Sequence, residues 1–272
     1  MREYLERVRE TSPLIHNITN YVTVNDCANI LLACGGSPIM ADDSREVEDI
    51  TSICAGLNIN IGTLNQHTIP AMLLAGKRAN LCGHPVLLDP VGAGASALRT
   101  DTARRLMEGI TFSAVRGNIS EIKALAGEES AARGVDADAV DAVTEENLEQ
   151  AEALVRAFAG RNHTVAAVSG AIDLVSDGER TYVIRGGHPI MSRITGSGCM
   201  LSAMTAAYIA SNPEHILEAA AAAFCAMGLC GEIAWRRMKP EDGNSSFRNY
   251  LIDAVYNLDG ETLEKGANYE VW

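Results

Sequence analysis

The stretch Ser192-Arg-Ile-Thr-Gly-Ser-Gly-Cys-Met-Leu-Ser-Ala-Met-Thr-Ala-Ala-Tyr208 joins a glycine-broken loop directly to an alanine-rich helical pattern. Glycines at 196 and 198 let the backbone approach a ligand closely, and the free N–H groups of a helix's first turn favour an anion such as phosphate. We therefore predict an anion hole at Gly196, Ser197 and Gly198. Cys199 lies at the same helix end, where we expect its thiolate to be favoured and its sulfur to serve as a base or a nucleophile. A turn followed by a small buried residue is the alternative interpretation of a lone Gly-x-Gly.

Composition limits the class of protein. The chain has 272 residues, 47% of them hydrophobic and 21% charged, enough for a substantial core in a single domain spanning 1–272. A net charge of −13 argues against a nucleic acid or a membrane surface as partner, since phosphate groups would be repelled. The seven cysteines are odd in number and lack metal-site spacing, and residues 1–10 form a charged amphipathic pattern without a signal-peptide core. We expect a cytoplasmic protein with reduced thiols.

Apolar strands alternate with helical patterns along most of the chain. We expect strands at 14–19, 37–41, 56–62, 85–89, 112–115 and 164–169, a hairpin of 172–175 and 181–184 at the sheet edge, and late helices at 199–210, 214–238 and 246–256. Strands separated by helices of about 10 to 16 residues imply right-handed βαβ units. The predicted fold is therefore a mostly parallel sheet with helices on both faces, a three-layer α/β/α arrangement. We interpret the acidic stretch 128–143 as a surface loop.

Polar loops follow several of these strands, and a parallel sheet gathers such loops at one edge, where ligands bind. Asp89 and Glu121 are hard oxygen ligands for Mg²⁺, and Arg116 is a cation suited to a nucleotide phosphate. Each has a simpler interpretation: Glu121 as the capping-box partner of Asn118, Arg116 as a surface cation, Asp89 as a hydrogen-bond acceptor. Together with the glycine loop before Cys199 they describe phosphoryl transfer, which needs a phosphate cradle, a metal, a cation and an acceptor for the hydroxyl proton.

Seven motifs give the chain a family resemblance from about residue 12 to 238. They are His16-Asn17-Ile-Thr-Asn20, Val22-Thr23-x-Asn25-x-x-Ala28-Asn29, Ser37-Pro-x-Met40-Ala, Asn60-Ile-Gly-Thr63-Leu, Leu88-Asp89-Pro-Val-Gly-Ala-Gly, Arg116-Gly-Asn-x-x-Glu121-Ile and Thr195-Gly-x-Gly-Cys199. In this order they resemble the hydroxyethylthiazole kinases, a branch of the ribokinase-like superfamily. Most members of that superfamily place an aspartate where this chain has Cys199, whereas the thiazole kinases place a cysteine.

The resemblance implies an ATP- and Mg²⁺-dependent kinase that phosphorylates 4-methyl-5-(2-hydroxyethyl)thiazole, a step of thiamine salvage. It implies that Cys199 is catalytic, that Arg116 and Ser169 contact ATP, and that Met40 and Gly196 contact the thiazole. It also implies a homotrimer with the thiazole site between subunits. Two positions depart from the family pattern, Ser169 where threonine is common and Ser197 where alanine is common. Both replacements keep a small side chain.

The amino-terminal segment carries many amide and imidazole groups. Caps and turn bonds account for Asn17 and Asn20. Asn25 falls inside a helical pattern, where asparagine is unfavourable without a partner, so we expect it to contact the substrate. Met40 ends a strand, and its thioether suits an aromatic thiazole, although methionine is more commonly a core residue.

Three other functions are compatible with parts of the sequence. A ribokinase-like kinase acting on hydroxymethylpyrimidine or pyridoxal is disfavoured by Cys199 and by the Asn25 and Met40 segments. A cysteine hydrolase pairing Cys199 with His16 or His188 leaves Asp89 and Arg116 without a role. A thiazole-binding protein without catalysis is the third alternative, and formation of ADP would exclude it.

Overall fold

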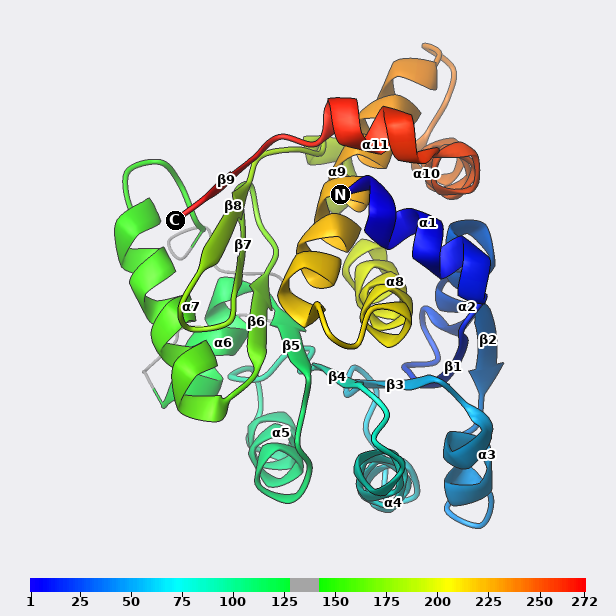
Figure 1. Ribbon diagram of the computed structural model, residues 1–272, viewed down its shortest axis with the longest axis vertical. Helices are drawn as coiled ribbons and strands as arrows, with labels where there is room; N and C mark the ends of the chain where they lie inside the picture. Colours follow the sequence, from blue (N-terminus) through cyan, green and yellow to red (C-terminus); the bar gives the residue numbers. More distant parts are fainter. Residues whose placement is uncertain (128–141) are drawn as a thin grey trace.

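The central element is one large sheet, seen along the middle of Figure 1. The protein is represented by a computed structural model that describes residues 1–127 and 142–272. In these residues nine strands pair in the order β2-β1-β3-β4-β5-β6-β7-β8-β9, parallel from β2 to β6 and antiparallel from β6 to β9. The strands are β1 Leu14–Ile18, β2 Ser37–Met40, β3 Gly56–Asn60, β4 Val86–Asp89, β5 Ala114–Gly117, β6 Val165–Val168, β7 Asp173–Ser176, β8 Thr181–Ile184 and β9 Tyr269–Val271. The mostly parallel sheet is thus confirmed.

Helices cover both faces of the sheet, which makes the predicted three layers (Figure 1). One core lies between the sheet and the group α1, α2, α8, α9 and α10, and the other lies between the opposite face and α4 to α7. The helices are α1 Arg2–Thr11, α2 Val24–Cys34, α3 Val47–Ile53, α4 Thr68–Cys82, α5 Ala97–Gly109, α6 Ile119–Ala126, α7 Leu148–Asn162, α8 Ser197–Ser211, α9 Ile216–Arg237, α10 Asn244–Asn257 and α11 Gly260–Gly266. A short 3₁₀ turn, Pro189–Arg193, precedes α8.

Helices α8 and α9 are apolar on nearly all sides because they lie inside the molecule. Helix α9 is long and apolar enough to cross a membrane by composition, but 72% of its most apolar window is buried inside the fold. It packs against α8, α10 and strands β6 to β8. Small alanine side chains allow this close packing, so α9 is a core helix.

Two expectations from the sequence need correction. The hairpin β7–β8 is not at the sheet edge, because β9 pairs with β8 through Tyr182 and Val271. A strand of three exposed residues near the end of the chain has no periodicity that would reveal it. The acidic stretch 128–143 lies almost wholly outside the described residues, but Val143 is buried rather than part of a surface loop.

Candidate active site

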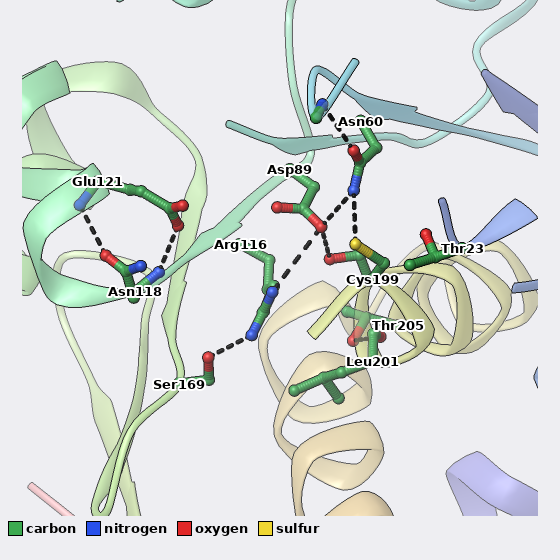
Figure 2. A network of polar contacts seen from close by, with 12 residues as sticks. Thr23, Asn60, Asp89, Arg116, Asn118, Glu121, Ser169, Cys199, Leu201 and Thr205 are labelled. Carbon is green, nitrogen blue, oxygen red and sulfur yellow. Dashed lines mark hydrogen bonds and ion pairs between the residues drawn. The ribbon is translucent and has the colours of Figure 1, made fainter. Parts of the chain in front are cut away.

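The carboxyl ends of the parallel strands bring together side chains that are far apart in the sequence. Asn60 at the end of β3 pairs with Asp89 at the end of β4, and Arg116 lies near the end of β5 beside Ser169, which follows β6. The first turn of α8 reaches the same edge (Figure 2). The sequence-based expectation that these loops gather at one edge is therefore confirmed.

Asp89 lies at the centre of this group and is fully buried. Its Oδ2 accepts hydrogen bonds from Asn60 Nδ2 (2.8 Å) and from Ser202 Oγ (2.7 Å), and Arg116 Nη1 lies 3.8 Å away. Burial raises the pKa of Asp89, while Arg116 and the two hydrogen bonds oppose that shift. Its other oxygen, Oδ1, is buried without a hydrogen-bond partner among the described residues. A buried unpaired carboxylate oxygen is costly, so it suggests an absent ligand.

Arg116 is a buried cation that contacts three parts of the site. Its Nη2 donates a hydrogen bond to Ser169 Oγ, as Figure 2 shows, and its Nη1 faces Asp89. Its guanidinium also lies against the first turn of α8, where a Cβ on Gly198 would come within 2.6 Å of Nη1. Arg116 is therefore not the exposed surface cation that the sequence also allowed.

The start of α8 has the geometry of an anion hole. Gly196 caps the helix with φ 85°, and a Cβ there would lie 2.5 Å from Thr23 Cγ2, so both backbone and space require glycine. The first intrahelical hydrogen bond of α8 runs from the Met200 N–H to Gly196 O (2.8 Å). The N–H groups of residues 197–199 therefore point beyond the helix end and are placed to receive an anion.

The Cys199 thiol is held by two amides. Asn20 Nδ2 and Asn60 Nδ2 each lie 3.3 Å from Sγ as donors. Asn60 directs its second N–H to Asp89, and Asn20 directs its second N–H to Asn60 Oδ1 (3.0 Å). We call Asn20, Asn60, Asp89, Cys199 and Ser202 the Asn60 network.

The expectation of a favoured thiolate at Cys199 is wrong. Burial, followed by the nearby charge of Asp89, raises the pKa of the Cys199 thiol above its ordinary value. Hydrogen bonds from Thr23, Asn20 and Asn60 act in the opposite direction without overcoming those effects. A helix N-terminus favours a thiolate only where desolvation and a neighbouring carboxylate do not outweigh it.

Glu121 has the capping role that the sequence offered as its simpler interpretation. Its Oε2 accepts from the Asn118 N–H (2.7 Å) and Asn118 Oδ1 accepts from the Glu121 N–H (2.9 Å), which completes a capping box. Its Oε1 accepts from the Gly92 N–H (2.8 Å). Burial, and next the charge of Asp89, raise the pKa of Glu121 to about 7.

The carboxylates of Asp89 and Glu121 have properties that suit a divalent cation. Asp89 Oδ1 is an unused hard ligand, and the charge of Asp89 acts on Glu121, so a nearby dication would relieve their repulsion. Across the described residues no three His, Cys, Asp or Glu side chains cluster as a metal site. Asp89, assisted by Glu121, is therefore the group that could hold such an ion.

Of the three residues expected near the thiazole, Gly196 caps α8 next to Cys199, whereas Met40 and Asn25 are not members of the Asn60 network. Met40 ends the edge strand β2 and is partly buried. Asn25 is exposed on α2, and its Oδ1 accepts from Asn29 Nδ2 (3.0 Å). The fold thus does not enclose Asn25 within its own chain.

Neither histidine proposed for a cysteine hydrolase pairs with Cys199 in the described structure. His16 bonds to Thr51 Oγ1 and to the Ala41 carbonyl, and His188 stacks on Trp235 with ring centroids 4.1 Å apart. The observed contacts therefore give the hydrolase alternative no base.

Sequence reasoning missed the role of two amides. Asn20 has the expected turn bond, in which its Oδ1 accepts from the Thr23 N–H (3.2 Å), but its amide nitrogen also contacts Cys199, and the sequence indicates no such role for Asn60 either. Only Asn60 carries a weak signal in the sequence, as an asparagine in a buried strand pattern, where amides are unfavourable without partners. Both side chains are buried and both contact Sγ of Cys199.

Comparison with known proteins gives one consistent family. The model of the hydroxyethylthiazole kinase family matches residues 5–261. The chain is 60% identical over 270 residues to the hydroxyethylthiazole kinase of Clostridium acetobutylicum, covering 99% of both chains, and 49% identical over 274 residues to that of Desulfovibrio desulfuricans, covering 98% of this chain and 96% of the relative.

Solved structures agree with these sequence relatives. The hydroxyethylthiazole kinase of Pyrococcus horikoshii superposes with a TM-score of 0.87 at 37% identity, covering 100% of this chain and 98% of that one. The pyridoxal kinase of Staphylococcus aureus in complex with ADP superposes with a TM-score of 0.63 at 15% identity, covering 95% and 97%, and supports the fold alone.

Proposed function

The chain belongs to the hydroxyethylthiazole kinase family, and from this membership we propose how its site carries out the reaction. The protein is a kinase that transfers a phosphoryl group from ATP to the hydroxyl of 4-methyl-5-(2-hydroxyethyl)thiazole, a step of thiamine salvage. The assignment of individual residues below is our proposal.

ATP phosphates bind between Arg116, Ser169 and the start of α8. The observation that carries this assignment is the buried guanidinium of Arg116, which bonds to Ser169 and lies against Gly198. A cation beside free helix N–H groups is suited to the charge that spreads over the transferring phosphoryl oxygens. The backbone of Gly196, Ser197 and Gly198 forms the anion hole at that point.

Cys199 contacts the substrate hydroxyl. Phosphoryl transfer through a loose transition state requires little deprotonation before attack, so a small thiolate fraction is sufficient as the base. The amides of Asn20 and Asn60 donate to Sγ and stabilise the thiolate when it forms. Because the pKa of this thiol is raised, turnover by this route increases with pH until the thiol is ionised.

Mg²⁺ is held by Asp89, assisted by Glu121, and by the phosphates of ATP. The unpaired Oδ1 of Asp89 and the mutual repulsion of the two carboxylates support this assignment. The ion neutralises phosphate charge when bound. The protein's own contribution is to keep Asp89 oriented through Asn60 and Ser202.

The thiazole ring contacts Met40, Gly196 and Asn25, with Asn25 supplied by a second subunit of a homotrimer. Support comes from the exposure of Asn25 and of its apolar neighbours Tyr21 (79%) and Val22 (56%), which a subunit interface would cover.

Mixing Asn25→Ala subunits with Cys199→Ala subunits tests whether two subunits share one thiazole site. Activity regained in the mixture supports it, and activity equal to the sum of the separate variants contradicts it. Sedimentation equilibrium measures the trimer directly.

We also propose a cytoplasmic location. All seven cysteines are free, which suits a reducing compartment.

The function is tested by ADP release from ATP with a panel of hydroxyalkyl heterocycles. We expect rapid ADP release with hydroxyethylthiazole and slow release with hydroxymethylpyrimidine, with pyridoxal or without an acceptor. A faster reaction with the pyrimidine or pyridoxal would contradict the substrate assignment.

A further inference from the structure

His16 is a buried residue that the reaction described above does not use. It lies on β1 with no exposed surface. Its Nε2 is 2.8 Å from the carbonyl oxygen of Ala41, and its Nδ1 is 2.9 Å from Thr51 Oγ1 on α3. Ala41 is the residue after Met40, so the ring connects the central sheet to the segment that ends the edge strand β2.

The hydrogen bonds fix the state of the ring. A carbonyl can only accept, so Nε2 carries the hydrogen. Burial lowers the pKa of His16, although the bond to Ala41 opposes that shift, and the ring is neutral at physiological pH. On the other side of the ring, Nδ1 lies 2.9 Å from Thr51 Oγ1, and the Thr51 hydroxyl donates to Val47 O (2.6 Å).

Strand β2 needs such a connection because it is the edge of the sheet. Among the described residues it pairs with β1 alone, and the last pair in the register is Met40 with Asn17. Beyond that pair the strand ladder ends, and the His16 ring bonds to the next carbonyl. We propose that His16 is a positioning residue for the thiazole site, holding Ala41 and through it the side chain of Met40. This inference rests on the proposed contact between Met40 and the thiazole.

Two matched substitutions of His16 distinguish the role of Nε2 from that of Nδ1. The glutamine amide places an N–H near the position of Nε2, whereas the asparagine amide places one near Nδ1. His16→Gln therefore keeps the bond to Ala41, and His16→Asn loses it and leaves a buried carbonyl unpaired. We expect His16→Asn to raise the KM for hydroxyethylthiazole at least about fivefold, and His16→Gln to keep it within about twofold of the unmodified enzyme. The KM for ATP should change less than about twofold in both.

The measurement is steady-state kinetics for both substrates, with a melting temperature for each variant. Equal thiazole KM values for His16→Asn and the unmodified enzyme would overturn the inference, as would a parallel rise for both substrates, which indicates a general folding defect. If both variants fail to fold, Thr51→Val removes the hydroxyl that contacts Nδ1. It should raise the thiazole KM about two- to tenfold, and no rise would overturn the inference.

Met40→Ala distinguishes this inference from the proposed function. A raised thiazole KM in Met40→Ala with no effect of His16→Asn would leave the Met40 contact in place and overturn the role of His16. A raised KM in His16→Asn with no effect of Met40→Ala would contradict the Met40 contact and overturn the inference that depends on it.

Discussion

Replacing Glu121 should change how the stability of the folded chain depends on pH. The pKa of Glu121 is raised from 4.5 to about 7 in the folded protein, chiefly by burial and next by Asp89. At about 1.4 kcal/mol per unit this difference corresponds to about 3 kcal/mol. Between pH 4.5 and 7 the folded state binds more protons than the unfolded state. The contribution is therefore fully present below pH 4.5 and is lost as the pH rises through 7.

The variant Glu121→Gln isolates this contribution because glutamine does not titrate. Other groups also titrate in the same range, so the informative quantity is the difference in unfolding free energy between the unmodified protein and the variant. Between pH 4.5 and 7.5, the unmodified protein should lose about 3 kcal/mol of unfolding free energy relative to Glu121→Gln. The control is Glu149→Gln, which removes an exposed carboxylate from the first turn of α7.

The assay is denaturant unfolding followed by circular dichroism, at fixed protein concentration because assembly would add a concentration dependence. Adding Mg²⁺ and ATP should move the pH range over which this free-energy difference changes to lower values, because a dication favours ionised carboxylates. Free-energy curves that stay parallel for the unmodified protein and Glu121→Gln would refute the raised pKa. Unchanged turnover of Glu121→Gln at limiting Mg²⁺ would return Glu121 to a capping role alone.

Three further predictions concern the anion hole and its neighbours. Arg116→Ala should weaken ATP binding about ten- to a hundredfold, measured by calorimetry, with little effect from the exposed control Arg104→Ala; equal weakening of ATP and thiazole would indicate misfolding. Cys199→Ala should lower kcat by a factor of at most about 10² to 10⁴ and change the thiazole KM little. A phosphocysteine detected by mass spectrometry would contradict the base role. Gly196→Ala should raise the thiazole KM and lower the melting temperature more than Gly83→Ala. Both glycines have positive φ, but a Cβ at 83 meets no described atom within 4 Å, so equal effects would leave backbone strain as the whole cause.

The sequence alone predicted much of the architecture because its signals are local. Apolar strands alternating with helices require a covered parallel sheet, and Asn118 with Glu121 three residues later marks a helix start that the structure confirms. The strand ends at Asp89 and Arg116 also follow from local patterns, so the edge that carries the site was predictable. Strand β9 was not, since three exposed residues have no pattern of their own.

Only the tertiary structure decided the chemistry of the side chains at that edge. The sequence placed Cys199 at a helix N-terminus and so suggested a lowered pKa. Folding instead buries the thiol beside Asp89, brings in the amides of Asn20 and Asn60, and raises its pKa. The same burial raises the pKa of Glu121 although its hydrogen bonds favour the charged form. Desolvation and charge pairing depend on residues distant in sequence that lie within a few ångströms in space, so no local pattern encodes them.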